Sequence, residues 1–591
     1  MNPAWKDEDL ESAILADISL DEPWALVERF STLTRLSGSE DEAVAARYIT
    51  DRLTEWGVDH NVFYPTCLIS IPGKATLRTL DDDARELTVK TTSFSPHTNG
   101  EEIEADLVYI PGHQAAGINE LFSEQRTATD VDLRGKVVMT EGLGIAARGF
   151  DLEASGAVAA VFINPGERIH EGITTTSWGS PDLDSTGRVA PVPILTINRP
   201  DGQSLIDALT DWPVRVAFSN QTDTAWRQIP VIVADVPGTD LADEFVLFHG
   251  HLDSWHVGVG DNATGDGTLL EVARVMHKHR SRLRRSLRVA WWSGHSHGRY
   301  AGSTWYADSF AFDLMTHCVS HVNCDSPGCR WATVYENVAW MSEAEEFCKN
   351  AIRDVTGQDS SGEGHVLRAG DISFNNLGVT TYFMLSSTMP DDLRAEKGYY
   401  PVGGCGGNIA WHTEDDTMEI ADRDNLLRDM RVYATVLLRS LNAPVAPFDY
   451  RATVDEMREA VDRYQSTAGE RFDFSPTFAA LESLRKTLDR LYERTSELGD
   501  SSARGEIQQA NAAQRALARV LVSLCYSRDG RFRQDPAQAI PTLPDLAPAT
   551  QLPGAETDLA MVIHNHLTRG QNRVIWELGQ AMQIADQVLA K

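Results

Sequence analysis

The stretch Phe245-Val-Leu-Phe-His-Gly-His251-Leu-Asp253, followed by Gly260-Asp261-Asn262-Ala-Thr-Gly265, decides the fold. The short apolar run predicts a buried strand, and the turn after it leads into a helical stretch from Thr268 to His279. A second buried strand is expected at 287–292 and another helix at 423–441. This alternation predicts an α/β fold with a mixed sheet covered by helices on both faces, and active-site residues at the carboxyl ends of the strands.

Two further regions flank this α/β part. Short β-branched runs separated by Gly, Pro and Asp predict a small β-rich insert over residues 101–228. Three-four spacing of apolar residues predicts a helical C-terminal domain over residues 447–591, and two amphipathic helices between residues 26 and 58. The α/β domain therefore combines residues 1–100 with residues 229–446.

The composition limits the possible partners. The chain has 591 residues, with 53 Lys and Arg against 86 Asp and Glu, and a formal net charge of −33. This charge opposes phosphate backbones and anionic lipids, so we expect no nucleic-acid partner and no membrane partner. The N-terminus lacks a signal-peptide pattern, and no stretch approaches the roughly 18 apolar residues of a membrane span, so a cytoplasmic protein is expected. Seven cysteines, odd in number and sparse, indicate reduced thiols.

Four residues have the types and positions of metal ligands. His251 ends the first strand and Asp261 follows at a turn, so the two can converge on one ion; imidazole and carboxylate are usual donors for zinc and similar divalent ions. Asp325 follows another apolar run, and His412 follows Trp411. Each is ordinary alone, since an Asp after a strand is usually a cap and a His after Trp is usually a packed core residue. Their order along the chain makes a joint accident improbable.

These segments together resemble the zinc aminopeptidase and glutamate carboxypeptidase II family, to which the transferrin receptor also belongs. The resemblance implies that His251 is the first metal ligand, that Asp253 orients it, and that Asp261 bridges two metals. It implies further that Asp325 and His412 are the fourth and last ligands.

The resemblance extends to the flanking regions. The phrases Asp132-Leu-Arg-Gly-Lys-Val-Val, Gly156-Ala-Val-Ala-Ala-Val-Phe-Ile-Asn and Pro191-Val-Pro-Ile-Leu are similar to the protease-associated domain of many family members. The helical region is implied to be a dimerisation domain, so a homodimer is expected. The alternative is a helical cap on the same subunit, because spacing alone cannot separate the two.

The sequence departs from the family at one place. Family members have two adjacent glutamates, a general base and then a metal ligand, before a Gly-Ser pair; counting back from Gly302-Ser303 puts Ser296 and His297 there. His297 can replace a carboxylate as a ligand. One negative ligand fewer predicts a more acidic bound water and a weaker hold on a second ion, so one or two ions are expected. Zinc is the first choice, with manganese or iron as alternatives.

The general base must then be a substitute. Ser296 is a poor base at neutral pH, and Ser296 paired with a neighbouring histidine as a nucleophile is disfavoured because adjacent residues of an extended segment point apart. His295, Glu414 and a metal hydroxide remain open, and we prefer His295.

Candidate substrate residues lie in two segments. Leu367-Arg-Ala-Gly-Asp371-Ile-Ser-Phe374 resembles the segment that lines the family's substrate pocket, and this makes Asp371 a candidate. Arg368 or Arg299 can pair with a substrate carboxylate, although an arginine is more often a solvated surface residue.

We therefore expect a metal-dependent hydrolase of an amide-type C–N bond, acting on a short peptide or a small-molecule amide with a non-standard base. The alternatives are a catalytically inactive binding or scaffold protein of the transferrin receptor type and a repurposed metal-dependent lyase. Retention of five possible ligands argues against an inactive protein.

Overall fold

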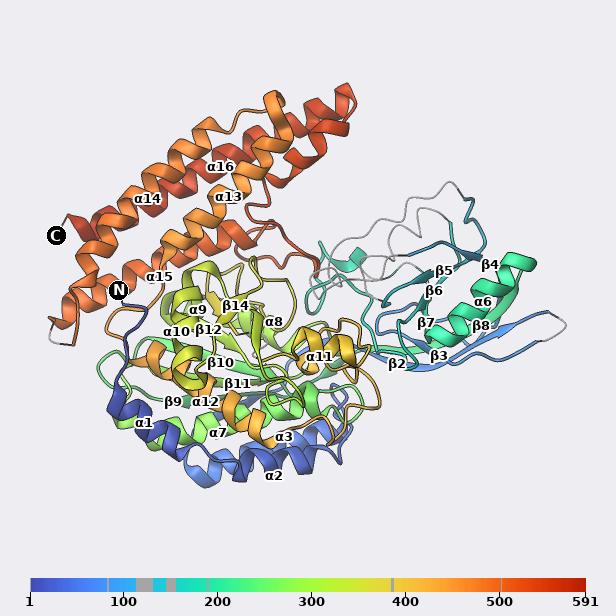
Figure 1. Cartoon of the computed structure of the whole chain (residues 1–591), viewed down its shortest axis with the longest axis horizontal. Helices are drawn as coiled ribbons and strands as arrows, with labels where there is room; N and C mark the ends of the chain where they lie inside the picture. Colours follow the sequence, from blue (N-terminus) through green and yellow to red (C-terminus); the bar gives the residue numbers. More distant parts are fainter. Residues whose placement is uncertain are drawn as a thin grey trace.

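A computed structural model describes most of the chain. The described residues are 2–81, 84–112, 131–144, 156–188, 190, 192–383, 387–500 and 502–590. Three groups of elements lie side by side: an α/β part, a second sheet at one end of it, and a layer of long helices (Figure 1).

The α/β part is built on a six-stranded sheet of order β1-β9-β11-β10-β12-β15. Its strands are β1 (Asp59–Phe63), β9 (Val231–Val236), β10 (Phe245–His251), β11 (Ser286–Trp292), β12 (Cys318–Asn323) and β15 (Thr380–Tyr382). β11, β10, β12 and β15 run parallel, whereas β9 and β1 are antiparallel to their neighbours, which confirms the predicted mixed sheet. The carboxyl ends of the parallel strands share one edge, where His251 pairs in register with Trp292.

Helices cover both faces of this sheet, as predicted. Side chains alternate along a strand, so the neighbours Trp291 and Trp292, both fully buried, enter different apolar clusters. Trp291 packs on the side of α7 (Thr264–Lys278) and α12 (Arg423–Asn442). Trp292 packs on the side of α8 and α9, near Tyr306. Helices α8 (Ala301–Ser309), α9 (Ala311–His317) and α10 (Glu345–Thr356) and the short elements β13 (Tyr335–Val338), β14 (Ser360–Gly362) and α11 (Asp391–Glu396) complete this part.

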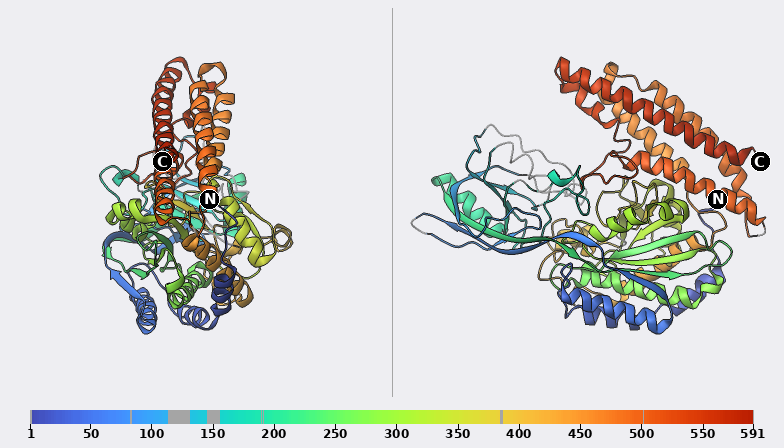
Figure 2. Two further views of the ribbon diagram at one scale, coloured as in Figure 1. Left: turned by 90° about the vertical axis from the view of Figure 1, so that its left-hand side faces the viewer. Right: turned by 180° about the vertical axis from the view of Figure 1, so that it is seen from behind.

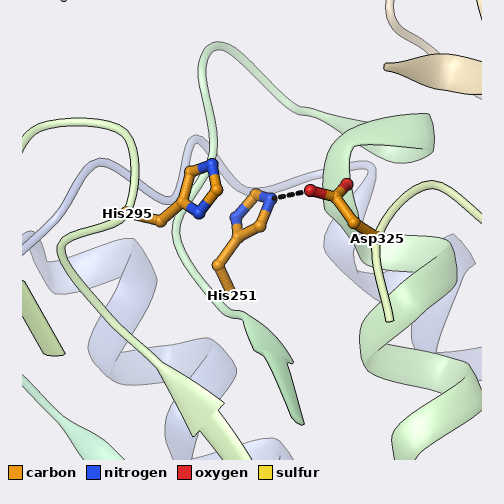
Figure 3. A group of neighbouring side chains, drawn as sticks. All are labelled: His251, His295 and Asp325. Carbon is orange, nitrogen blue, oxygen red and sulfur yellow. Dashed lines mark ion pairs between the residues drawn. The ribbon is translucent and has the colours of Figure 1, made fainter. Parts of the chain in front are cut away.

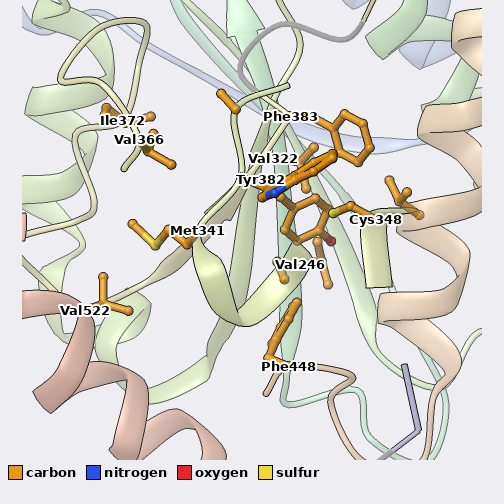
Figure 4. Packing of buried hydrophobic residues seen from close by; sticks show 14 of the residues in the cluster. Val246, Val322, Met341, Cys348, Val366, Ile372, Tyr382, Phe383, Phe448 and Val522 are labelled. Carbon is orange, nitrogen blue, oxygen red and sulfur yellow. The ribbon is translucent and has the colours of Figure 1, made fainter. Parts of the chain in front are cut away.

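The larger cluster continues to the edge of the sheet. Val246 of β10, Val322 of β12 and Tyr382 of β15 pack together there (Figure 4). The N-terminal helices also join it, and they are α1 (Glu8–Asp17), α2 (Asp21–Phe30) and α3 (Glu40–Trp56). Two helices are predicted here, and α1 is a further one that begins at an Asp7 N-cap.

A second, seven-stranded sheet has the order β2-β8-β4-β5-β6-β7-β3. Its elements are β2 (Thr66–Thr79), β3 (Val89–Thr91), β4 (Ile103–Tyr109), β5 (Val137–Glu141), β6 (Ala159–Ile163), β7 (Ile194–Ile197) and β8 (Arg215–Gln228), with helix α6 (Arg199–Asp211). This sheet starts before the predicted boundary at residue 101, because β2 pairs along its length with β8. The assignment of this region as a protease-associated domain stays a prediction.

The C-terminal region is helical. It contains α13 (Tyr450–Ala468), α14 (Ser475–Ser496), α15 (Arg504–Tyr526) and α16 (Thr557–Leu589), which form a layer beside the α/β part (Figure 2). The leucines that follow three-four spacing in α14, Leu481, Leu484, Leu488 and Leu491, are buried. A role in dimerisation stays a prediction. Among the described residues, no helix is both long and apolar enough to cross a membrane.

Candidate metal centre

Four side chains from separate segments meet at the carboxyl edge of the sheet. His251 ends β10, Asp261 lies in the turn that leads into α7, and Asp325 follows β12 by two residues. His412 comes from the loop between α11 and α12. The parallel strands place the first three at one edge, as the strand order predicts.

The donor atoms lie at distances suited to metal ligands. His251 Nε2 is 2.8 Å from Asp261 Oδ1 and 3.8 Å from Asp325 Oδ2, and His412 Nε2 is 3.2 Å from Asp261 Oδ2. Two ligands of one tetrahedral zinc ion lie about 3.3 Å apart, given bonds of about 2.0–2.2 Å. Within the described residues, His251 Nε2 and Asp261 Oδ1 are buried without a hydrogen bond of acceptable geometry, although they are close. Asp261 thus presents one oxygen to each histidine.

The electrostatics of the cluster favour a cation. Burial opposes charge on His251, but Asp261 and Asp325 outweigh it and raise the pKa of this imidazole well above its ordinary value. Burial likewise opposes charge on Asp261, and His251 and His412 outweigh it and hold its pKa well below the ordinary value. Two carboxylates with two neutral imidazoles form a net anionic donor set, which suits a divalent ion.

Asp253 orients His251 in a way that differs from the prediction. His251 Nδ1 lies 2.8 Å from the backbone oxygen of Asp253 but 4.0 Å from its carboxylate. The carboxylate instead accepts the backbone N–H groups of His295 and Ser296, at 3.1 and 2.8 Å, and the hydroxyl of Ser37, at 2.7 Å. Burial opposes charge on Asp253, but the neighbouring imidazoles, His297 first and then His251 and His295, hold its pKa below the ordinary range. The carboxylate therefore fixes the loop that carries His295.

The imidazole ring of His295 stacks face to face on the ring of His251. The two rings are stacked, 3.8 Å apart at their centroids and 16° from parallel, and His251 lies between His295 and Asp325 (Figure 3). Ligand atoms of these three residues lie within 4.8 Å of one another. An ion lies close to the plane of each imidazole that binds it, and two stacked, nearly parallel planes do not share such a point. In this arrangement His295 is therefore not a second imidazole on the ion of His251.

A buried carboxylate holds His295 in place. His295 Nδ1 lies 2.8 Å from Asp371 Oδ2, and Asp371 Oδ1 accepts the Ser303 hydroxyl at 2.6 Å. Asp371 is fully buried. A carboxylate on Nδ1 places the ring proton there and leaves Nε2 as an acceptor. The predicted substrate residue Asp371 is thus a partner of His295.

His297 points elsewhere. Its Nδ1 lies 3.0 Å from Ser37 Oγ, its ring packs 4.2 Å from Trp255, and it is fully buried. It does not join the His251 group, and its Nε2 has no hydrogen bond within the described residues. The structure therefore brings His295, and not the predicted ligand His297, next to His251. Ser296 is buried as well.

Two other predicted residues have structural partners instead. Glu414, a candidate base, pairs with Lys90 at 2.6 Å, has a side chain that is 45% exposed, and does not line the cavity beside the cluster. Arg368, a candidate substrate residue, donates to the backbone oxygens of Asp535 and Pro536 and stacks on Trp178 at 4.0 Å. The guanidinium of Arg368 therefore binds the segment that follows α15, and its substrate role stays a prediction.

A cavity of about 60 Å³ adjoins the cluster and is lined by Asp261, His295, Arg299, Asp325 and His412 among others. The second sheet region also lines it, through residues such as Glu171. The backbone of Glu171 holds His412 on both sides, accepting from Nδ1 at 3.0 Å and donating to the His412 oxygen at 2.8 Å. Neither Glu171 nor Ser37 was found from sequence. Each contacts a site residue more than 200 positions away in the sequence, so no local motif identifies it.

Comparisons with known proteins agree with this geometry. Residues 231–437 match the profile of Peptidase family M28. Over 495 residues the chain is 22% identical to Probable glutamate carboxypeptidase VP8 of Zea mays, covering 72% of this chain and 67% of that protein. Over 325 residues it is 26% identical to aminopeptidase NAALADL1 of Mus musculus, covering 49% of this chain and 42% of that protein. The chain thus spans less than half of the mouse relative.

The fold has a solved counterpart. A zinc aminopeptidase from Bacillus subtilis superposes with a TM-score of 0.51 at 17% identity, over 72% of this chain and 96% of its own. The predicted metallopeptidase-type enzyme is confirmed at the level of the family. Residues 231–437 thus match peptidase family M28, and the predicted resemblance to zinc aminopeptidases and carboxypeptidases is confirmed.

Proposed function

We propose that this protein hydrolyses an amide-type C–N bond with a divalent metal and with His295 as the general base. The observation that carries the proposal is the convergence of His251, Asp261, Asp325 and His412 beside a cavity into which His295 also faces. The substrate is a short peptide or a small-molecule amide.

One ion is held more firmly than a second. His251, Asp261 and Asp325 offer three donors to the first position. The second position has the other Asp261 oxygen and His412, and no further His, Cys, Asp or Glu joins them in the clusters of the described residues. We therefore propose a single tightly bound zinc. When bound, it supplies a Lewis acid that polarises the amide carbonyl and favours deprotonation of water.

The His295–Asp371 pair replaces the missing glutamate. Nε2 of His295 takes a proton from the attacking water and later returns it to the leaving amine. Asp371, 2.8 Å from Nδ1, keeps the ring in the correct tautomer and stabilises the charged imidazolium while it holds that proton. Hydrogen bonds from the His295 and Ser296 N–H groups to Asp253 fix the loop during this transfer.

Chelation and reconstitution test this proposal. Dialysis against a chelator should abolish hydrolysis of a panel of aminoacyl and N-acyl amino-acid amides, and zinc should restore it. Asp325→Asn should lose activity and zinc together. Asp415→Asn is the matched control, because Asp415 lies in the His412 loop but pairs with Arg168 at the surface. Full activity in metal-free protein would contradict the proposal.

The alternatives give different results. A binding or scaffold protein of the transferrin receptor type would show no turnover with or without zinc. A metal-dependent lyase would cleave the bond without incorporating oxygen from water, which mass spectrometry in ¹⁸O-labelled water distinguishes.

We also propose a homodimer formed through α16. This helix leaves Leu559, Val562 and Trp576 exposed at 51%, 64% and 68%. These residues recur at helical spacing on its outer side, which suits an apolar contact with a second copy. Light scattering on the purified protein tests this expectation.

A further inference from the structure

Arg299 is a buried arginine beside the reaction centre. It lies in the turn before α8, is 4% exposed, and lines the same cavity as His295, Asp325 and His412. Its φ of 49° is unusual for a residue other than glycine. The loop therefore holds this side chain at the cavity against a conformational cost.

Among the described residues, the guanidinium of Arg299 lacks the partners that other buried arginines have. Arg35 donates to several backbone oxygens, and Arg519 donates hydrogen bonds to four backbone oxygens. Arg285 pairs with Glu244 at 2.7 Å. Arg299 makes one long hydrogen bond, 3.5 Å from Nη2 to the Ala537 oxygen. Its Nε has no partner within the described residues. Buried, charged donors left unpaired are costly, so a ligand is expected to satisfy them.

The charge around the cavity indicates the chemistry of that ligand. A planar guanidinium matches a carboxylate through two parallel hydrogen bonds. Glu171, the acidic lining residue outside the metal cluster, already has partners in Lys90 at 2.9 Å, which it shares with Glu414, and in His256 at 3.1 Å. The cavity thus offers a cation for a substrate anion but, among the described residues, no unpaired carboxylate for a substrate amine.

The size of the cavity narrows the class further. A volume of about 60 Å³ holds roughly four to six water molecules, or one small residue. A phosphate dianion would add more negative charge beside Asp261 and Asp325, so a carboxylate fits better.

We propose that Arg299 is a specificity-determining residue that binds the free carboxylate of a small acyl amino acid or dipeptide. This inference rests on the proposed function for the hydrolysis of the substrate, but the binding step needs no turnover. The carboxylate on Arg299 leaves the neighbouring amide within the cavity that His295 and the metal cluster share.

Calorimetric titration with N-acetylglycine and with N-acetylglycinamide tests the proposal on the intact zinc-loaded protein. The acid should bind at least about tenfold more tightly than the amide, the scale of a charge-assisted hydrogen bond. Arg299→Gln should reduce this preference to about twofold or less. Arg330→Gln, at an exposed arginine of a neighbouring cavity, should retain it.

Equal binding of acid and amide by the wild type would overturn the proposal, and this comparison does not depend on any variant folding. The same preference in a folded Arg299→Gln protein would also overturn it. Because the readout is binding, a protein that selects the acid but hydrolyses nothing would refute the proposed function and leave Arg299 in its role. Hydrolysis without selection would do the reverse.

Discussion

Replacing Asp371 with Asn tests the assignment of His295 as the base. Asn keeps the size of the side chain and can keep a contact with Ser303, so the fold should survive. It removes the negative charge that lies 2.8 Å from His295 Nδ1 in a fully buried position. A hydrogen bond to a charged group is worth about 1.5–3 kcal/mol, which corresponds to roughly a 10- to 100-fold loss in rate.

The loss should appear in kcat, with KM little changed, because the imidazolium forms only during turnover. Steady-state hydrolysis of the best substrate measures both constants, and elemental analysis should show unchanged zinc. Asp313→Asn serves as the control, since Asp313 lies on α9 and pairs with Arg288 of β11. Wild-type kcat in Asp371→Asn would refute His295–Asp371 as the base, and loss of zinc would show that His295 supports the metal instead.

Three further predictions concern stability and assembly. Leu488→Ala should lower the free energy of unfolding by about 2–5 kcal/mol, since Leu488 is fully buried in α14, and urea denaturation followed by circular dichroism measures this. Burial raises the pKa of Glu363 from 4.5 to about 7, so its contribution to stability is fully present below pH 4.5 and is lost as the pH rises through 7. The free energy of unfolding of Glu363→Gln, measured relative to wild type, should therefore rise by roughly 1–2 kcal/mol between pH 4.5 and pH 8, a value reduced for partial exposure. The same difference between variant and wild type at both pH values would contradict this. Trp576→Glu should convert the proposed dimer into a monomer in light scattering, and a monomeric wild type would contradict that expectation.

Much of the fold follows from local patterns. The buried strand ending at His251 and the helix after Asp261 are marked by a continuous apolar run and a turn, and both occur where the sequence predicts them. The leucine spacing of α14 predicts one apolar helix face, and that face is buried. The boundary of the second sheet could not be predicted from a local pattern, because the pairing of β2 with β8 joins segments far apart in the chain.

The site was predictable only in part for the same reason. Strand ends and turn residues identify His251, Asp261 and Asp325, since the parallel strands bring those positions to one edge. Counting along a motif placed His297 in the cluster, but the loop conformation, fixed by Asp253, brings His295 there instead. The partner of each side chain is set by tertiary contacts. Arg368 and Arg299 are both buried arginines, yet Arg368 donates from both Nε and Nη2 to backbone oxygens, whereas Arg299 Nε has no partner among the described residues.

The most direct test of the account is the zinc content of the wild type, His251→Ala and His295→Ala, measured with hydrolytic activity on protein purified without a metal-binding tag. We predict about one tightly bound zinc in the wild type, its loss in His251→Ala, its retention in His295→Ala, and loss of activity in both variants. A wild type without stoichiometric metal, or a His295→Ala protein that loses zinc while His251→Ala retains it, would contradict the account.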